Sequence, residues 1–109
     1  MKIPENAFIS NDKLSKYLLI YREQDDKSKF LAQADFTSAN PEELETALRQ
    51  LITEVEAEQD DENQYGTFYL VKGNLVGVNE RKLAVITVWM KETATDQFRF
   101  ITLKPWKKD

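Results

Sequence analysis

The chain has 109 residues, of which 41% are apolar and 11% are aromatic, and its net charge is -4. This length suits one domain with one core, spanning residues 1–109. The sequence contains no Cys and no His, which excludes disulfides, Ser-His and Cys-His nucleophile pairs, a His general base and ordinary zinc sites.

Two short helices are predicted near the N-terminus. The first covers about 12–21 and follows Ser10, whose hydroxyl can cap exposed helix amides. Lys13 and Lys16 are expected to face water. The second helix covers about 27–34. The apolar residues of the first helix recur at intervals of three and four, and so predict a buried stripe: Leu14, Tyr17, Leu18 and Tyr21.

The main helix is predicted over about 41–56. Asn40 is a capping residue type, Pro41 suits the first turn, and Glu42 and Glu43 favour the positive end of the helix dipole. The apolar residues lie on one face for about four turns, so we expect this helix to pack across a sheet: Leu44, Ala47, Leu48, Leu51, Ile52 and Val55.

An acidic segment follows the main helix. Residues 54–62 hold six carboxylates in nine positions, where the negative end of the helix dipole disfavours them. We expect residues 57–64 to form a flexible, solvated linker. The alternatives are a Ca²⁺ or Mg²⁺ site and a docking surface for a basic partner, but the ligand order of an EF-hand loop is missing.

Three segments with strand character follow, at about 67–71, 83–90 and 98–103. They predict an α+β fold in which two or three N-terminal helices precede a three- to four-stranded antiparallel meander, with the main helix packed on the sheet. Residues 104–109 are expected to form a C-terminal tail.

The segment Leu83–Met90 is the expected central strand. Both of its faces are apolar, whereas a half-exposed strand alternates apolar and polar residues. The strand should therefore be covered on both faces. We expect the cover beyond the main helix to come from the N-terminal helices or from another subunit.

Several short motifs occur in a distinctive order: Lys13-Leu14, Tyr17-Leu18-Leu19, Lys27 to Leu31, Tyr65-Gly66-Thr67, Gly73-x-Leu75-x-Gly77, Asn79 with Arg81, Thr87-Val88-Trp89 and Arg99 to Pro105. In order and spacing, about residues 10–105 resemble the uncharacterised bacterial family called domain of unknown function six-eight-eight-three. Because this family has no assigned activity, the resemblance implies more about fold than about function.

The sequence departs from the family pattern in two places. Family members often carry His, Pro and Gly in the segment that corresponds to Ile20–Asp26, which here has none of them and is about two residues shorter. Glu80 stands where the family has a hairpin glycine. Chemistry that depends on histidine is therefore not transferable to this chain.

Helices followed by an antiparallel sheet are also similar to the architecture of small bacterial ribonuclease toxins, which is an analogy of fold alone. Some of those enzymes use Lys, Arg and Tyr in place of His. The candidate catalytic residues are therefore Lys27, Arg81 and Arg99, with Tyr69 as a hydroxyl donor. The alternative is that these are surface cations with buried stems, and a tyrosine that packs at the sheet edge.

Two further aromatic residues are candidates for binding. Tyr65 could supply a hydroxyl to the same site, or pack at the sheet edge. Trp106, next to Lys107 and Lys108, could stack on a base or anchor a partner; the alternative is a tail that folds back on the domain. Trp89 is expected to pack in the core.

These observations favour a small bacterial cytoplasmic domain that acts without catalysis, as a binding, regulatory or protein-interaction module. The alternatives are a histidine-free ribonuclease-toxin-like domain or its inactive relative, and a small-molecule site between the main helix and the sheet. The expected partner is a second copy or another protein. The charge disfavours nucleic acid but leaves it open. No cofactor, metal or membrane span is expected.

Overall fold

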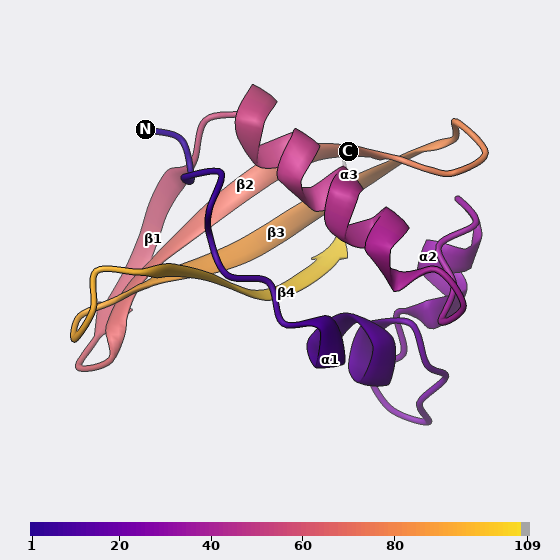
Figure 1. The fold of residues 1–109 in the computed structure, drawn as a ribbon, viewed down its shortest axis with the longest axis horizontal. Helices are drawn as coiled ribbons and strands as arrows, with labels where there is room; N and C mark the ends of the chain where they lie inside the picture. Colours follow the sequence, from indigo (N-terminus) through magenta and orange to yellow (C-terminus); the bar gives the residue numbers. More distant parts are fainter. Residues whose placement is uncertain (108–109) are drawn as a thin grey trace.

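The computed structural model describes residues 1–107, and it has the predicted α+β architecture. Figure 1 shows the helix α3 lying across one face of the sheet, with the smaller helices beside β4. The strands form one antiparallel sheet in the order β1-β2-β3-β4. The elements are α1 (Asn11–Lys13), η1 (Leu14–Leu18), α2 (Ser28–Ala32), α3 (Pro41–Glu54), β1 (Glu58–Asn63), β2 (Gly66–Val76), β3 (Lys82–Glu92) and β4 (Phe98–Pro105).

Helix α3 begins at Pro41, as predicted, but the side chain of Asn40 does not cap it. That side chain instead accepts the amide of Thr37 at 2.8 Å, which shapes the turn before the helix. The predicted apolar face is buried, except that Val55 packs against the core only in part. The helix approaches β2 closely at Gly73, where an added Cβ would lie 2.8 Å from Cδ1 of Leu51.

The first helix differs from the prediction in its winding. After one α-turn it becomes the π-helix η1, in which the amide of Leu19 bonds to the carbonyl of Leu14 at 3.0 Å. A π-turn holds more residues than an α-turn, so the buried face changes phase. Leu19 is buried, whereas Tyr17 and Tyr21 are 55% and 61% exposed. The expected burial of these two tyrosines was therefore wrong.

The acidic segment contains a strand where we expected a linker. Strand β1 pairs antiparallel with β2, and all six of its side chains are exposed. An edge strand needs only one hydrogen-bonded neighbour, so its acidic side chains can stay in water while its backbone pairs with β2. Lys72 of β2 contacts Glu58 at 3.2 Å. The charge pattern that suggested a linker is that of a solvated sheet edge.

Strand β3 lies in the middle of the sheet and holds three fully buried residues, Val85, Thr87 and Trp89. The Thr87 hydroxyl donates to the carbonyl of Val71 at 2.9 Å and accepts the indole N–H of Trp89 at 2.8 Å. Both polar groups are thus satisfied inside the core, and burying them carries no penalty for a missing hydrogen bond. Trp89 packs in the core, as predicted.

The second face of β3 is not buried as we expected. Leu83, Val85, Thr87 and Trp89 are buried on the side of α3, whereas alternate residues on the opposite side are only half-buried. The N-terminal helices add to the core at the β4 edge, through residues such as Leu14 and Leu18. The N-terminal segments reach the second face only at β4, where Lys27 bonds to Thr102, and the β3 residues of that face stay half-buried.

The C-terminal segment is shorter than the predicted tail. Strand β4 extends to Pro105, and the amide of Trp106 donates to the carbonyl of Ala84 at 2.9 Å. Residues 108 and 109 of the predicted tail lie outside the described residues. Among residues 1–107, no helix has the length and apolar character needed to cross a bilayer.

Candidate functional site

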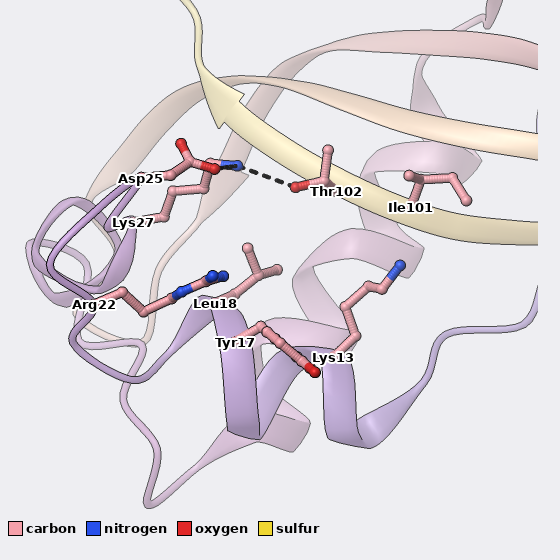
Figure 2. A pocket seen from close by; sticks show the side chains of 8 residues that line it. All are labelled: Lys13, Tyr17, Leu18, Arg22, Asp25, Lys27, Ile101 and Thr102. Carbon is pink, nitrogen blue, oxygen red and sulfur yellow. Dashed lines mark hydrogen bonds and ion pairs between the residues drawn. The ribbon is translucent and has the colours of Figure 1, made fainter.

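The pocket of greatest chemical interest lies between the first helix, the loop before α2 and strand β4 (Figure 2). Its volume is about 210 Å³. We call it the basic pocket, and it is lined by Lys13, Tyr17, Leu18, Arg22, Asp25, Lys27, Ile101 and Thr102.

Lys27 is the best-anchored cation of the basic pocket. Its ammonium donates to the hydroxyl of Thr102 at 3.1 Å and lies 3.6 Å from the carboxylate of Asp25. The Lys27 side chain is only 15% exposed, whereas that of Asp25 is 77% exposed. A carboxylate so exposed contributes little as an ion-pair partner, so Lys27 retains much of its capacity to bind an anion.

The loop that carries Arg22 and Lys27 is held by Asp26. One oxygen of its carboxylate accepts the amide of Arg22 at 3.1 Å and both the amide and the hydroxyl of Ser28, at 3.2 and 2.7 Å. The hydrogen bond from the Ser28 hydroxyl is the largest cause that lowers the pKa of Asp26. Asp26 thus holds both ends of the segment from Arg22 to Ser28, which carries the two cations.

Lys13 lies in the same pocket, at the end opposite Lys27 in the view of Figure 2. It is half-buried rather than turned to water as predicted. Burial lowers the pKa of Lys13 below its ordinary value of 10.5, and the nearby guanidinium of Arg99 lowers it further. A lysine with a lowered pKa in a pocket is a candidate for binding or proton transfer.

Tyr17 and Arg22 complete the polar lining. The guanidinium of Arg22 lies 5.5 Å from the centre of the Tyr17 ring, a cation–π contact that holds the two side chains together. The widened turn of η1 places Tyr17 toward the pocket instead of the core. π-turns of this kind often occur at functional sites.

The composition of the basic pocket defines the ligand class that suits it. Three cations face one exposed carboxylate, and the Tyr17 hydroxyl can donate a hydrogen bond to a ligand. The Thr102 hydroxyl accepts from Lys27 and donates to the carbonyl of Leu103 at 3.4 Å. Such a set favours a small anion with several oxygens, such as a phosphate group. The volume is below the roughly 300–1,000 Å³ typical of sites for drug-sized ligands, so the pocket suits a phosphate rather than a whole nucleotide.

The structure separates the three cations predicted to converge. Lys27 lines the basic pocket and Arg99 lies close enough to affect Lys13, but Arg81 is exposed in the turn between β2 and β3. That turn packs against the loop after α2, where Asn79 donates to the carbonyl of Gln33 at 3.1 Å. Arg81 is not among the residues of the basic pocket.

Tyr65 and Arg99 line a second, shallower pocket of about 440 Å³, with Glu92 and Met90. Arg99 is paired there with Glu92 at 3.4 Å and lies over the ring of Phe8. Tyr69 packs partly against the core, with its ring 5.6 Å from that of Phe98.

Trp106 is half-buried and continues the pairing of β4 with β3 beyond Pro105. The roles predicted for Tyr65, Tyr69 and Trp106 remain predictions.

Of the residues that line the basic pocket, the sequence analysis singled out only Lys27, and it missed five polar ones as site residues: Lys13, Tyr17, Arg22, Asp25 and Thr102. Lys13 and Tyr17 do belong to the first family-like motifs, and Thr102 to the last. Arg22 lies in the segment that departs from the family. Within residues 1–107, no group of three or more Asp and Glu side chains is arranged to hold a metal ion.

Comparison with solved structures shows that this fold has been seen before. One chain of the "Contact-dependent growth inhibition toxin - immunity protein complex from Klebsiella pneumoniae 342" is similar, with a TM-score of 0.59 and 17% sequence identity. The match covers 94% of this chain and 96% of that chain. At this identity the similarity establishes the shared fold alone, and no curated protein matches the sequence.

The family suggested by the sequence motifs is confirmed. The model of that family matches residues 2–107, nearly the whole chain. Its match includes the segments that line the basic pocket, from Lys13 to Lys27 and at Thr102. The protein belongs to the family described as "Domain of unknown function (DUF6883)".

Proposed function

We propose that this chain is a toxin-type domain that acts on RNA in the bacterial cytoplasm, with a backbone phosphate held in the basic pocket. One observation carries the proposal: Lys13, Arg22 and Lys27 line one small pocket together with the hydroxyls of Tyr17 and Thr102. The fold shared with a chain of a toxin–immunity protein complex supports a role in such systems.

RNA suits a site without histidine because it carries its own nucleophile. The ribose 2′-hydroxyl attacks the adjacent phosphorus, the bond from phosphorus to the 5′-oxygen breaks, and a 2′,3′-cyclic phosphate and a 5′-hydroxyl form. The site must accept the 2′-hydroxyl proton, stabilise the charge on the phosphate oxygens and supply a proton to the leaving oxygen.

The pocket residues match these three tasks. Lys13 lines the pocket at the end opposite Lys27, and its amine is the group we assign to accept the 2′-hydroxyl proton; burial lowers its pKa in the direction that this role requires. Lys27 and Arg22 provide positive charge for the phosphate oxygens, and Thr102 keeps the Lys27 ammonium in place. The Tyr17 hydroxyl is the proton donor available to the leaving 5′-oxygen in this set.

The test is cleavage of RNA by the purified chain. We expect fragments with 2′,3′-cyclic phosphate and 5′-hydroxyl ends, and no cleavage of an RNA with 2′-deoxyribose at the cleavage site. Lys27→Met should lower the rate by about 10- to 100-fold, since a hydrogen bond to a charged group contributes about 1.5–3 kcal/mol. The matched control is Lys16→Met, at an exposed lysine of η1 that does not line the pocket.

Expression in bacteria gives a second readout of the same proposal. Wild-type protein should arrest growth, and the Lys27→Met variant should do so much less at equal abundance. If wild type and Lys27→Met behave alike in both assays, the proposal is wrong.

A second candidate is a protein-interaction module without catalysis, as the sequence composition favours. The specific observation is that Ile20–Asp26 lacks the His, Pro and Gly that family members often carry there, and this segment forms one side of the basic pocket. If the chain is such a module, the wild-type protein should leave RNA intact and should not slow bacterial growth. It should also bind stably to a protein encoded beside it. RNA cleavage that depends on Lys27 would exclude it.

A further inference from the structure

The face of the sheet opposite α3 is apolar at its centre. We call it the open face. On β2 and β3 the register places six half-buried apolar residues there: Phe68, Leu70, Ala84, Ile86, Val88 and Met90. Lys72 and Asn74 lie on the same face at the end nearer the β2–β3 turn, and Glu92 lies at the other end. An antiparallel sheet with one face in water normally carries polar residues on that face. A continuous apolar patch on such a face indicates a binding surface.

The two edges of the open face carry opposite charges. On the β1 side, Glu58 is paired with Leu70 of the open face and contacts Lys72 at 3.2 Å. Asp60 and Asp61 follow in the irregular part of the strand, and all three acids are exposed. On the β4 side, Arg99 and Lys104 are placed by their pairing with Met90 and Ile86 on the open face. The surface thus has an acidic edge, an apolar centre and a basic edge, which makes it complementary to itself after rotation.

We infer that the open face binds the open face of a second copy of this chain, in a dimer whose two-fold axis runs parallel to the strands. This orientation places β1 of each copy over β4 of its partner, so the acidic edge meets the basic edge. A two-fold axis perpendicular to the strands would place β1 over β1. Like charges would then face each other, which is destabilising.

The register makes the contacts specific, because rotation about this axis preserves position along the strands. Leu70, Val88 and Glu58 lie at one level of the sheet, so Leu70 of one copy meets Val88 of the other. Two residues further along these strands, Phe68 of β2 is paired with Met90 of β3, and Met90 is paired with Arg99 of β4. At that level β1 presents Asp60 and Asp61, between its paired residues Gln59 and Glu62.

The size of the face is sufficient for a specific but weak dimer. Four strands spaced about 4.8 Å apart and about eight residues long span roughly 500 Å² per copy. Two copies therefore bury about 1,000 Å², which is near the lower limit for a specific interface. The dimer should exchange with monomer at micromolar concentrations.

The test is sedimentation velocity of the full chain between about 5 and 200 µM. We expect a shift from the 12.7 kDa monomer to twice that mass, with a dissociation constant that rises as salt is added, because acidic and basic edges attract each other. A dimer that tightens with salt would contradict the inferred orientation. A chain that stays monomeric at 200 µM would overturn the inference.

Two sets of variants locate the interface. Val88→Asp should weaken the dimer by about 100-fold, because it buries an unpaired carboxylate, whereas Val78→Asp, at a residue 47% exposed in the β2–β3 turn, should not. Arg99→Glu with Lys104→Glu should also weaken it, and Asp60→Lys with Asp61→Lys should then restore it. Unaltered dimers in Val88→Asp, with normal circular dichroism, would place the interface elsewhere.

Thr102 of the basic pocket pairs with Val88, so the pocket lies at the β4 edge of the open face. The two claims are separated by Val88→Asp, at a residue that does not line the pocket. A monomeric Val88→Asp variant can still cleave RNA, and a wild-type dimer can form whether or not RNA is cleaved.

Discussion

The ammonium of Lys27 donates to the hydroxyl of Thr102 at 3.1 Å, across 75 positions of the sequence. This bond joins the loop before α2 to strand β4 and so closes one end of the basic pocket. It also fixes a charge that would otherwise move on a flexible stem. A positioned cation binds a phosphate with less loss of side-chain entropy than a free one.

Removing either partner of this bond should weaken binding of inorganic phosphate. Lys27→Met deletes the charge and should raise the dissociation constant of phosphate by about 10- to 100-fold, because a hydrogen bond to a charged group contributes about 1.5–3 kcal/mol. Thr102→Val keeps the charge of Lys27 but removes the hydrogen bond that positions it. This variant should raise the dissociation constant of phosphate about fivefold, which corresponds to a loss of about 1 kcal/mol. Isothermal titration calorimetry measures both. Equal affinity in all three proteins would show that phosphate does not bind here.

Lys13→Met should change how stability depends on pH. Because the folded state lowers the pKa of Lys13 below 10.5, the unfolded chain binds its proton more tightly. At pH values below the folded-state pKa, wild type therefore carries the full free-energy cost of keeping Lys13 charged in a half-buried site. This cost disappears as pH rises toward and beyond 10.5. We expect the variant to be more stable than wild type near neutral pH, by an amount that shrinks as pH rises.

Urea unfolding of wild type and Lys13→Met from pH 7 to 11 measures this difference. Lys16→Met controls for the loss of one positive charge. A stability difference between wild type and Lys13→Met that is constant across this range would contradict the burial assigned to Lys13.

The bond between Thr87 and Trp89 should stabilise the core. Thr87→Val leaves the indole N–H of Trp89 buried without a partner, and should lower the free energy of unfolding by about 1–3 kcal/mol. In the double variant with Trp89→Phe, the loss should be smaller than the sum of the two single losses, since both remove the same bond. Denaturant unfolding tests this, and simple additivity would show that the bond contributes nothing.

Gly73→Val should destabilise the packing of α3 on β2. Its Cβ would lie 2.8 Å from Cδ1 of Leu51 and 3.3 Å from Cγ2 of Val55, and such overpacking typically costs about 1–3 kcal/mol. Combining it with Leu51→Ala should recover part of the loss, whereas an independent pair of sites would show additive losses. Thermal unfolding of the three variants makes the comparison.

Much of the fold was predictable because it follows from local patterns. The capping sequence from Asn40 to Glu43 and the apolar face that follows it gave the position of α3, and the apolar run at Leu83–Met90 gave the central strand. Strand β1 was missed because its side chains are all exposed. Its strand conformation depends on pairing with β2, and nothing in the hydropathy pattern shows that pairing.

The basic pocket was harder to predict because it depends on tertiary contacts. Lys27 was singled out through its family-like motif, but its partner Thr102 was not. Lys13 and Tyr17 were assigned to the wrong environment, since an ideal α-helical period places Tyr17 on the buried stripe and the π-turn does not. To place Tyr17 correctly, the sequence would have needed a recognisable signal for the π-turn at Leu14–Leu18.

The most direct test of the phosphate site is nuclear magnetic resonance of the full chain, titrated with inorganic phosphate and then with a short oligoribonucleotide. Both ligands should shift the signals of these polar pocket residues: Lys13, Tyr17, Arg22, Lys27 and Thr102. Lys27→Met should abolish most of the shifts. Shifts confined to α3, β1 or the β2–β3 turn, or no shifts at millimolar phosphate, would contradict a phosphate site in this pocket.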